Sequence, residues 1–468
     1  MKKFLTAVMS LLLVGLTCIL IYVAVNQGSF NLNWNKDWDK LLFSSTAPTE
    51  VSAPSTPPRS QGTTVQEKVP DDNEGGSTLS VSKTIAPSSK NYAFLPQHSG
   101  VDCLTDSGSR ALYDQMLKTA YTVTSKPDKE GYYATGPITI SKQKITENQI
   151  RMAVLAFRND HPQVFWIANR YSYSTNGFST TVKLYSYIPA SQCNTLVKKL
   201  NSSITKIVGA MPAGLSELNR EVYIFKIIAQ KCIYDDAAVT DTTLWLPHTA
   251  VGGLVDGKAV CEGYARAMQV LSSYCGLESQ TVNGDGNGAA HMWNLMKIDG
   301  SWYQFDPTWI DGTMINYDYF NVTDDIIRVD HTISADISSL SEEQVKSDDN
   351  KPADYNLTLP PCDAVKANYY VAKGIHIADF ESENNNTVIS AIVAAAKVKS
   401  SVVVFYIEES LDYKQTVSQM LKTSPYQLSY YIKKANQALG GSVVISENNI
   451  RYTESENNRG ITVMLSYQ

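Results

Sequence analysis

The chain has 468 residues, which is long enough for two or three folded domains. Its content of 43% hydrophobic and 18% charged residues is that of a folded protein and excludes a wholly disordered chain. The net charge of −6 argues against nucleic acid as a main partner, because nucleic-acid-binding surfaces are basic.

The N-terminal segment from Phe4 to Val25 carries no formal charge and follows Lys2 and Lys3. At about 1.5 Å per residue, a helix of this length spans roughly 33 Å, enough to cross the hydrocarbon core of a membrane. The lysines favour a cytoplasmic N-terminus and an exported remainder, so we expect an uncleaved, single-pass anchor with extracytoplasmic domains. A cleaved signal peptide is disfavoured because no small-x-small site ends the run, and lipidation of Cys18 is disfavoured because the apolar run continues past it.

Residues 1–43 form this anchor and a juxtamembrane segment, and residues 44–99 are rich in Ser, Thr, Pro and Gly. A segment with few large apolar side chains cannot bury enough surface to fold, so we expect a disordered linker. Such a linker would hold the folded part of the chain away from the membrane.

Residues 100–218 show the patterns of a smaller α/β domain, with helical spacing of apolar residues alternating with β-branched and aromatic runs. The predicted elements are helices at 110–122 and 147–158, strands at 164–174 and 179–188, and a helix at 191–211. The turn Thr175-Asn176-Gly177 connects the two strands into a hairpin.

Cys261 lies in the segment that carries the residue types of a catalytic set. Small residues surround it, and a helical stripe of Ala265, Met268 and Leu271 follows up to Gly276. We therefore predict Cys261 at a helix N-terminus, where free backbone N–H groups and the helix dipole favour the thiolate. The same N–H groups can bind an oxyanion that forms beside the sulfur.

His291 begins a predicted strand, which the turn Asp299-Gly300 connects to a second strand ending at Asp306. A two-residue turn pairs Ile298 with Ser301, which puts His291 and Asp306 on one sheet face as diagonal neighbours. Diagonal pairs lie roughly 7–8 Å apart at the backbone, so an imidazole and a carboxylate can meet there. The carboxylate would hold the tautomer of the ring and stabilise its charged form.

Two neighbouring features have plainer interpretations. The stretch 284–288 (GDGNG) lacks the Lys-Ser/Thr ending of a phosphate loop and precedes a strand, so we expect a flexible loop beside the site. Trp293, Trp302 and Trp309 are expected to be core aromatics of the sheet rather than platforms for a ligand.

These motifs resemble the transglutaminase-like superfamily, a papain-like group. Cys261, His291-Met292-Trp293 and Asp306-Pro307-Thr308-Trp309 follow the family pattern in order and in spacing. The segments 221–235 and 317–321 also resemble bacterial members, so the resemblance extends over about a quarter of the chain.

The resemblance implies an α+β fold with a core at residues 219–335, in which a helix bearing the cysteine packs on an antiparallel sheet bearing the histidine and the aspartate. It implies catalytic roles for Cys261, His291 and Asp306. The family also uses a further oxyanion donor, for which Trp245 is a candidate by residue type alone.

After an acidic, Ser-rich segment at 340–351, residues 365–468 are predicted to form a second flanking α/β domain. Its predicted elements are a strand at 401–407, helices at 412–421 and 428–439, and strands at 442–453 and 460–467. The sequence assigns no chemistry to either flanking domain.

The chain has seven cysteines, of which Cys18 lies in the predicted anchor and Cys261 is the candidate nucleophile. The five others are an odd number, which leaves at least one unpaired. Cys232 and Cys275 lie on the apolar stripes of predicted helices and are expected to be buried. No pair of cysteines has metal-ligand spacing with a histidine, so we expect neither a metal site nor a cofactor.

The predicted function is that of an extracytoplasmic cysteine enzyme that cleaves amide or peptide bonds through a thioester on Cys261. Water as the acceptor would make it a protease or amidase and an amine would make it a transamidase; hydrolysis is favoured because it needs less special architecture. The expected partner is a protein or peptide substrate, either free or associated with the cell wall of a bacterium. A non-catalytic binding or scaffold module that keeps the fold is the alternative from another class.

Overall fold

The computed structural model describes residues 77–83, 91–141, 145–176, 178–241, 243–311, 316–333, 359–448 and 450–468. The predicted anchor, its juxtamembrane segment and the acidic segment 340–351 lie outside these residues, as does most of the predicted linker. Among the described helices, none combines the length and the apolar character that crossing a bilayer requires.

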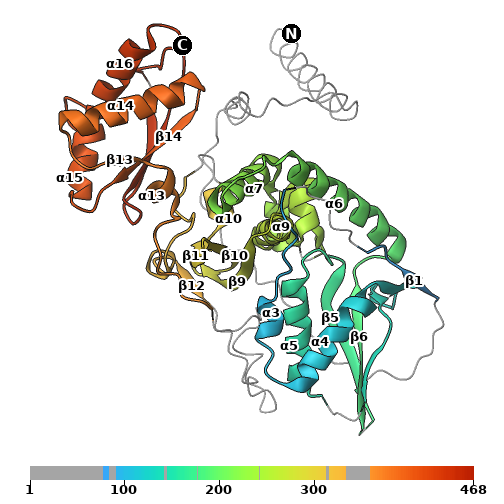
Figure 1. Cartoon of the computed structure of the whole chain (residues 1–468). Helices are drawn as coiled ribbons and strands as arrows, with labels where there is room; N and C mark the ends of the chain where they lie inside the picture. Colours follow the sequence, from blue (N-terminus) through green and yellow to red (C-terminus); the bar gives the residue numbers. More distant parts are fainter. Residues whose placement is uncertain are drawn as a thin grey trace, which may run out of the picture.

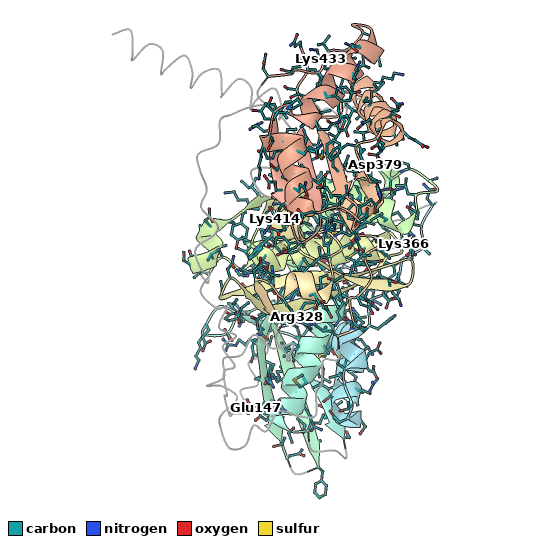
Figure 2. All side chains as sticks on the ribbon, turned by 90° about the vertical axis from the view of Figure 1, so that its left-hand side faces the viewer. Glu147, Arg328, Lys366, Asp379, Lys414 and Lys433 are labelled. Atoms are coloured by element: carbon teal, nitrogen blue, oxygen red, sulfur yellow. The ribbon has the colours of Figure 1, made fainter. Side chains whose placement is uncertain are left out.

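The described chain has an N-terminal part, a central core and a C-terminal part, which follow one another along the molecule (Figure 1). Figure 2 shows Glu147 in the N-terminal part near one end and Lys433 in the C-terminal part near the other. Each part combines helices with a sheet, which confirms the predicted α+β class.

The N-terminal part packs helices against a four-stranded sheet in which β5 and β4 both pair with β6. Its helices are α3 (Ser99–Asp102), α4 (Ser107–Ala120), α5 (Glu147–Asp160) and α6 (Ala190–Ala210), and its strands are β2 (Thr122–Thr124), β3 (Tyr133–Ala134), β4 (Ile138–Ser141), β5 (Ile167–Thr175) and β6 (Ser179–Ser186). The predicted helices and the hairpin are confirmed with shifted bounds. Strand β5 begins later than predicted because Val164 donates its backbone N–H to His161 in a turn.

The predicted linker is wrong in its last part. Strand β1 (Thr78–Ser80) pairs with β2 through Leu79 and Val123, and the side chain of Val81 is buried. Gln97 donates its side-chain amide to the carbonyl of Leu277 in the core. Composition could not reveal these contacts, because a few apolar residues suffice to order a segment that finds a strand partner far along the chain.

The core contains the residues that the sequence singled out. Its helices are α7 (Glu217–Lys231), α8 (Asp236–Thr240), η1 (Leu246–His248), η2 (Gly252–Asp256), α9 (Cys261–Tyr274), α10 (Pro307–Ile310) and α11 (Asp324–Ile327). Its strands are β7 (Ile233–Tyr234), β8 (Lys258–Ala259), β9 (Glu278–Gly286), β10 (Ala289–Ile298), β11 (Ser301–Phe305) and β12 (His331–Ile333). The last four strands form an antiparallel sheet in the order β11-β10-β9-β12.

The hairpin register is confirmed. Ile298 pairs with Ser301, and the same register continues to Asn294 and Phe305. Asp299 and Gly300 take the positive φ angles, 50° and 85°, that a two-residue turn between twisted strands requires.

Helix α9 packs against one face of this sheet, as the resemblance implied. Asn294 donates its side-chain amide to the carbonyl of Ala265 over 3.0 Å, and Met296 lies beside Ser272. The other face buries Trp293 and Leu295 in a separate apolar cluster. The sheet is therefore covered on both sides, which holds its register against slippage.

The stretch 284–288 is not the flexible loop that we predicted. Gly284 and Gly286 belong to β9, and only Asn287 and Gly288 form the turn to β10, with φ angles of 50° and 78°. A Cβ atom on Gly284 would lie 2.0 Å from the carbonyl oxygen of Thr332. These glycines thus permit close contact between strands rather than flexibility.

The C-terminal part forms a mixed sheet in the order β13-β14-β16-β15. Its helices are α13 (Tyr369–Lys373), α14 (Ser382–Lys397), α15 (Tyr413–Val417), η3 (Ser418–Lys422) and α16 (Gln427–Leu439), and its strands are β13 (Ile375–Ile377), β14 (Val402–Ile407), β15 (Arg451–Ser455) and β16 (Gly460–Met464). The sequence missed α14. The predicted strand at 442–453 is wrong before Arg451, because the polar run 446–449 carries no alternating apolar face.

Direct contacts join this part to the core. The rings of Tyr317 and Tyr369 stack with centroids 3.5 Å apart, and Asn368 donates to the side-chain oxygen of Asn458 over 2.8 Å. Cys193, Cys232, Cys261, Cys275 and Cys362 have no disulfide partner among the described residues.

Candidate active site

Cys261 is the first residue of α9, where its backbone N–H has no partner within the helix. The preceding residue, Val260, gives no side-chain cap, so no capping side chain binds the N–H groups at this end of the helix. Gly263 allows the helix end to pack tightly, since a Cβ atom there would lie 2.2 Å from the carbonyl oxygen of Pro247. Cys261 is nearly buried, with 9% of the residue exposed.

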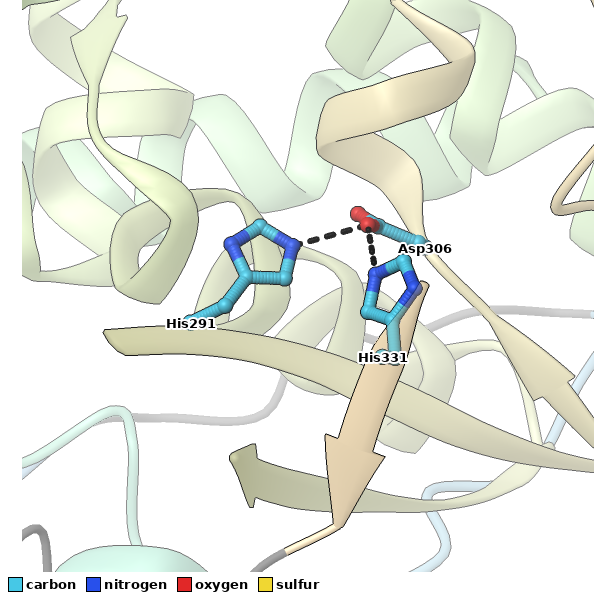
Figure 3. Close-up of side chains that lie close together, drawn as sticks. All are labelled: His291, Asp306 and His331. Atoms are coloured by element: carbon cyan, nitrogen blue, oxygen red, sulfur yellow. Dashed lines mark hydrogen bonds and ion pairs between the residues drawn. The ribbon is translucent and has the colours of Figure 1, made fainter. Parts of the chain in front are cut away.

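His291 lies between Cys261 and Asp306. Its Nε2 is 2.7 Å from Oδ2 of Asp306 (Figure 3), and the thiol of Cys261 is in hydrogen-bond contact with the same ring. Since Nε2 donates to the carboxylate, Nδ1 is the ring atom that faces the sulfur. The structure thus brings the three predicted site residues into one chain of contacts.

Asp306 is fixed from the other side by backbone donors. It is the N-cap of α10, and its Oδ1 accepts from the N–H groups of Thr308 and Trp309 at 2.9 and 3.2 Å. Pro307 at the first helical position favours this geometry, because its fixed φ suits the helix start and its missing N–H is not needed there. The backbone of the Asp-Pro-Thr-Trp motif therefore holds the carboxylate of its own aspartate in a fixed orientation.

His291 and Asp306 each stabilise the charged form of the other. Burial by itself would lower the pKa of His291, but Asp306 and the thiolate of Cys261 outweigh it and raise this pKa to about 10. Burial would likewise raise the pKa of Asp306, but His291 and His331 hold it well below its usual range. At neutral pH His291 is therefore an imidazolium that faces the ionised carboxylate of Asp306.

His331 is a member of this cluster that the sequence analysis missed. Its Nε2 lies 3.2 Å from Oδ2 of Asp306, and its Nδ1 lies 2.6 Å from Oδ1 of Asp330. His331 begins β12, on the opposite side of β9 from His291. Gly286 leaves the space in which the rings meet, because a Cβ atom there would lie 2.9 Å from Trp309 and 3.4 Å from the His291 ring.

Comparison with known proteins identifies the core. Residues 207–307 match the sequence model of the transglutaminase-like superfamily. This chain carries a transglutaminase-like core. The resemblance stated from the motifs is thereby confirmed for this part of the chain.

Two solved structures are similar to the chain. One is a TGase, with 14% identity and a TM-score of 0.24, and the match covers 38% of this chain and 52% of that chain. The other is a protein of Cytophaga hutchinsonii proposed to be a cysteine protease, with 11% identity and a TM-score of 0.19 over 40% and 69% of the two chains. The chain thus spans about half the length of the TGase. No curated protein sequence matches it.

Tyr234 is a second residue of the transglutaminase-like core that the sequence did not mark. Its hydroxyl accepts a hydrogen bond from the backbone N–H of Cys261, and burial together with the nearby thiolate raises the pKa of Tyr234. This N–H is the one that would bind an oxyanion beside the sulfur. Trp245, the candidate by residue type, instead stacks on Tyr187 with centroids 4.7 Å apart and joins the core to the N-terminal part.

Glu262, next to the candidate nucleophile, is held in a buried network of charges. Arg266 donates to it over 2.9 Å, His248 lies 3.2 Å away and Arg158 lies 3.7 Å away. Arg266 also donates to the carbonyl of Arg158 over 2.8 Å. The network therefore fastens the first turn of α9 to η1 and to α5 of the N-terminal part.

The tryptophans divide between core and site. Trp293 is buried and donates to the side-chain oxygen of Gln304 over 2.7 Å, and Trp302 packs against the same apolar cluster. Trp309 lies on α10 rather than in the sheet, with its ring 4.3 Å from His331 and 5.6 Å from His291. It covers the imidazoles and excludes water from them.

The side chains of His291, Asp306 and His331 offer three atoms within 4.8 Å of one another, close enough to hold a metal ion. Both ring nitrogens that point at Asp306 are already donors to one oxygen of this carboxylate, so the cluster is complete as a chain of hydrogen bonds. Sequence spacing could not reveal this grouping, because the histidines come from strands on opposite sides of β9.

Proposed function

We propose that the transglutaminase-like core is a cysteine enzyme that acts on amide or peptide bonds through a thioester on Cys261. The observation that carries this proposal is the buried chain of contacts from the Cys261 thiol through His291 to Asp306. A thiol at a helix N-terminus beside a carboxylate-bound imidazole is the arrangement that nucleophilic catalysis by cysteine requires.

The reaction begins with attack of the thiolate on the substrate carbonyl. The oxyanion that forms is stabilised by the N–H of Cys261 and the hydroxyl of Tyr234, which already lie together. His291 donates its Nδ1 proton to the leaving amine, and Asp306 keeps the ring in the required orientation. The C–N bond breaks and leaves a thioester on Cys261.

The thioester is then resolved by water or by an amine. Hydrolysis is favoured, since Nδ1 of His291 can activate a water molecule without any further binding site. Because Cys261 is nearly buried, we expect its substrate to present an extended, slender group, such as a peptide or the side chain of glutamine. We place the enzyme on a bacterial surface, tethered through residues 4–25, with a protein, peptide or wall-associated substrate.

A limiting amount of a thiol-reactive peptide electrophile tests the proposal at neutral pH, with mass spectrometry to find the adduct. We expect one adduct, on Cys261, formed at least about tenfold faster than on any other of the described thiols, which are buried except for the partly exposed Cys103. His291→Ala should abolish this preference. Slow labelling that is spread over the cysteines and indifferent to His291 would favour a non-catalytic binding module.

A further inference from the structure

The histidine at the start of β12 has no part in the reaction proposed above, yet it touches the same carboxylate as His291. The side chain of His331 is fully buried, and each of its ring nitrogens faces a carboxylate oxygen. The oxygens belong to Asp306, at 3.2 Å from Nε2, and to Asp330, at 2.6 Å from Nδ1. Figure 3 shows the two imidazoles converging on Asp306 from different strands.

The charge of His331 follows from its partners. An ionised carboxylate only accepts hydrogen bonds, so a ring nitrogen that bonds to one must carry a proton. Asp330 accepts on its second oxygen from the hydroxyl of Tyr319, and Asp306 accepts on its second oxygen from backbone N–H groups. With both carboxylates acting as acceptors, both ring nitrogens of His331 are donors and carry protons.

The aromatic surroundings favour a cation at this position. The ring of His331 lies 4.3 Å from Trp309, 5.0 Å from Trp293 and 5.4 Å from Tyr319, measured between centroids. Aromatic faces attract a buried cation, and this attraction offsets part of its lost hydration. The titratable groups that face His331 are Asp306, His291, Asp330 and the hydroxyl of Tyr319.

We propose that His331 is a positioning residue of the catalytic set, a buried imidazolium that fixes the Asp306 carboxylate and weakens its hold on the proton of His291. This role rests on the proposed function, in which His291 must give that proton to the leaving amine. The rings of His291 and His331 are 5.4 Å apart and share one oxygen of Asp306, so each positive charge disfavours the other. A general acid with too high a pKa transfers its proton slowly. The positive charge of His331 opposes the charge of His291 and so makes this proton easier to transfer.

Nitrogen-15 spectra of the imidazole groups test the charge directly, in the full chain labelled at its six histidines. We expect both nitrogens of His331 to be protonated at neutral pH, because each of them faces a carboxylate oxygen. His331→Gln assigns the signals, because it removes one set and keeps a donor toward Asp306. A His331 nitrogen without a proton at neutral pH would overturn the proposal.

The effect on His291 is measured in the same spectra. His331→Gln should raise the pH at which His291 loses its proton, by about one unit, because it removes the neighbouring positive charge. Asp330→Asn should change it in the same direction, because it removes the carboxylate that stabilises the positive charge of His331. Asp330 lies partly at the surface, so its variant is expected to fold even if His331→Gln does not. The matched control is His376→Gln, which breaks a similar 2.6 Å contact to Glu408 in the C-terminal part and should leave His291 unchanged.

The rate at which Cys261 is alkylated shows whether His331 acts by orienting Asp306 or only by filling space in the core. His331→Gln, which still donates to Asp306, should keep the rate within about tenfold of the parent, whereas His331→Leu should lose more, because Asp306 is then free to rotate. Equal rates in the two variants, or an unchanged His291 transition in both His331→Gln and Asp330→Asn, would overturn the proposal. An inert Cys261 beside a doubly protonated His331 would overturn the proposed function alone and support the assigned charge.

Discussion

Replacing Asp306 by Asn should lower the rate at which Cys261 is alkylated or acylated near neutral pH by roughly 10²–10⁴-fold. The carboxylate is what raises the pKa of His291 to about 10 against the opposing effect of burial. Without that charge the buried ring becomes neutral near pH 7, and it can no longer stabilise the thiolate or protonate a leaving amine. The amide can also donate to Nε2 of His291, which would leave the wrong tautomer facing the sulfur.

Asp306→Asn keeps the shape of the site, so a change in the alkylation rate reports the loss of the carboxylate charge. Asn is as good an N-cap as Asp, and α10 should keep its start at Pro307. Asp324→Asn is the matched control, because Asp324 accepts from Gln304 over 2.8 Å in the same core without touching the site. Its rate should stay within about twofold of the parent. An unchanged rate in Asp306→Asn would remove Asp306 from the proposed mechanism.

Glu262→Gln should destabilise the protein by about 3 kcal/mol, because it leaves a buried guanidinium without its counter-charge. Arg266 bonds to Glu262 through two nitrogens at 2.9 Å, and its side chain is only 8% exposed. The loss should also loosen the contact between α9 and the N-terminal part, since Arg158 approaches the same carboxylate. Unfolding by denaturant, followed by tryptophan fluorescence, measures the change.

The loss of stability caused by Glu262→Gln should become smaller as the pH falls. Burial would raise the pKa of Glu262, but Arg266 and His248 outweigh it and hold the pKa below its usual range. A carboxyl group with a lowered folded-state pKa stabilises the protein above its unfolded-state pKa, about 4.3, and loses this contribution as the pH falls. The difference between parent and Glu262→Gln should therefore be smaller at about pH 3.5 than at pH 7.

A surface ion pair on the same core is the control for Glu262. Glu278 and Lys297 pair at 2.9 Å, but their side chains are 46% and 35% exposed. Glu278→Gln should cost less than about 1 kcal/mol, because water screens the pair. An equal loss of free energy of unfolding in Glu262→Gln and Glu278→Gln would contradict the buried character of the charge network beside Cys261.

The parts of the site that the sequence could predict are those with local signals. The start of α9 is marked by small residues before an apolar stripe, and the hairpin is marked by Asp299-Gly300 between two strands. The turn fixes the register, and the register brings His291 to Asp306. Each inference needs only neighbours in the chain and the periodicity of helix or strand.

The parts that could not be predicted depend on contacts between distant segments. His331 meets Asp306 because β12 pairs with the far side of β9, and Tyr234 meets Cys261 because β7 pairs with β8. Neither pairing leaves a mark in the local pattern of residues. Strand β1 also depends on a distant partner, which is why composition alone assigned it to a linker.

The proposed thioester on Cys261 is tested most directly by the intact mass of the full chain after brief reaction with an activated acyl donor and quenching in acid. We expect one acyl group per chain, attached to Cys261 as a thioester, absent in Cys261→Ala and strongly reduced in His291→Ala. Addition of a primary amine before the quench should release the acyl group as an amide if the enzyme is a transamidase, and as the free acid if it is a hydrolase. No acyl group on Cys261, or acylation that persists unchanged in Cys261→Ala, would contradict the central claim.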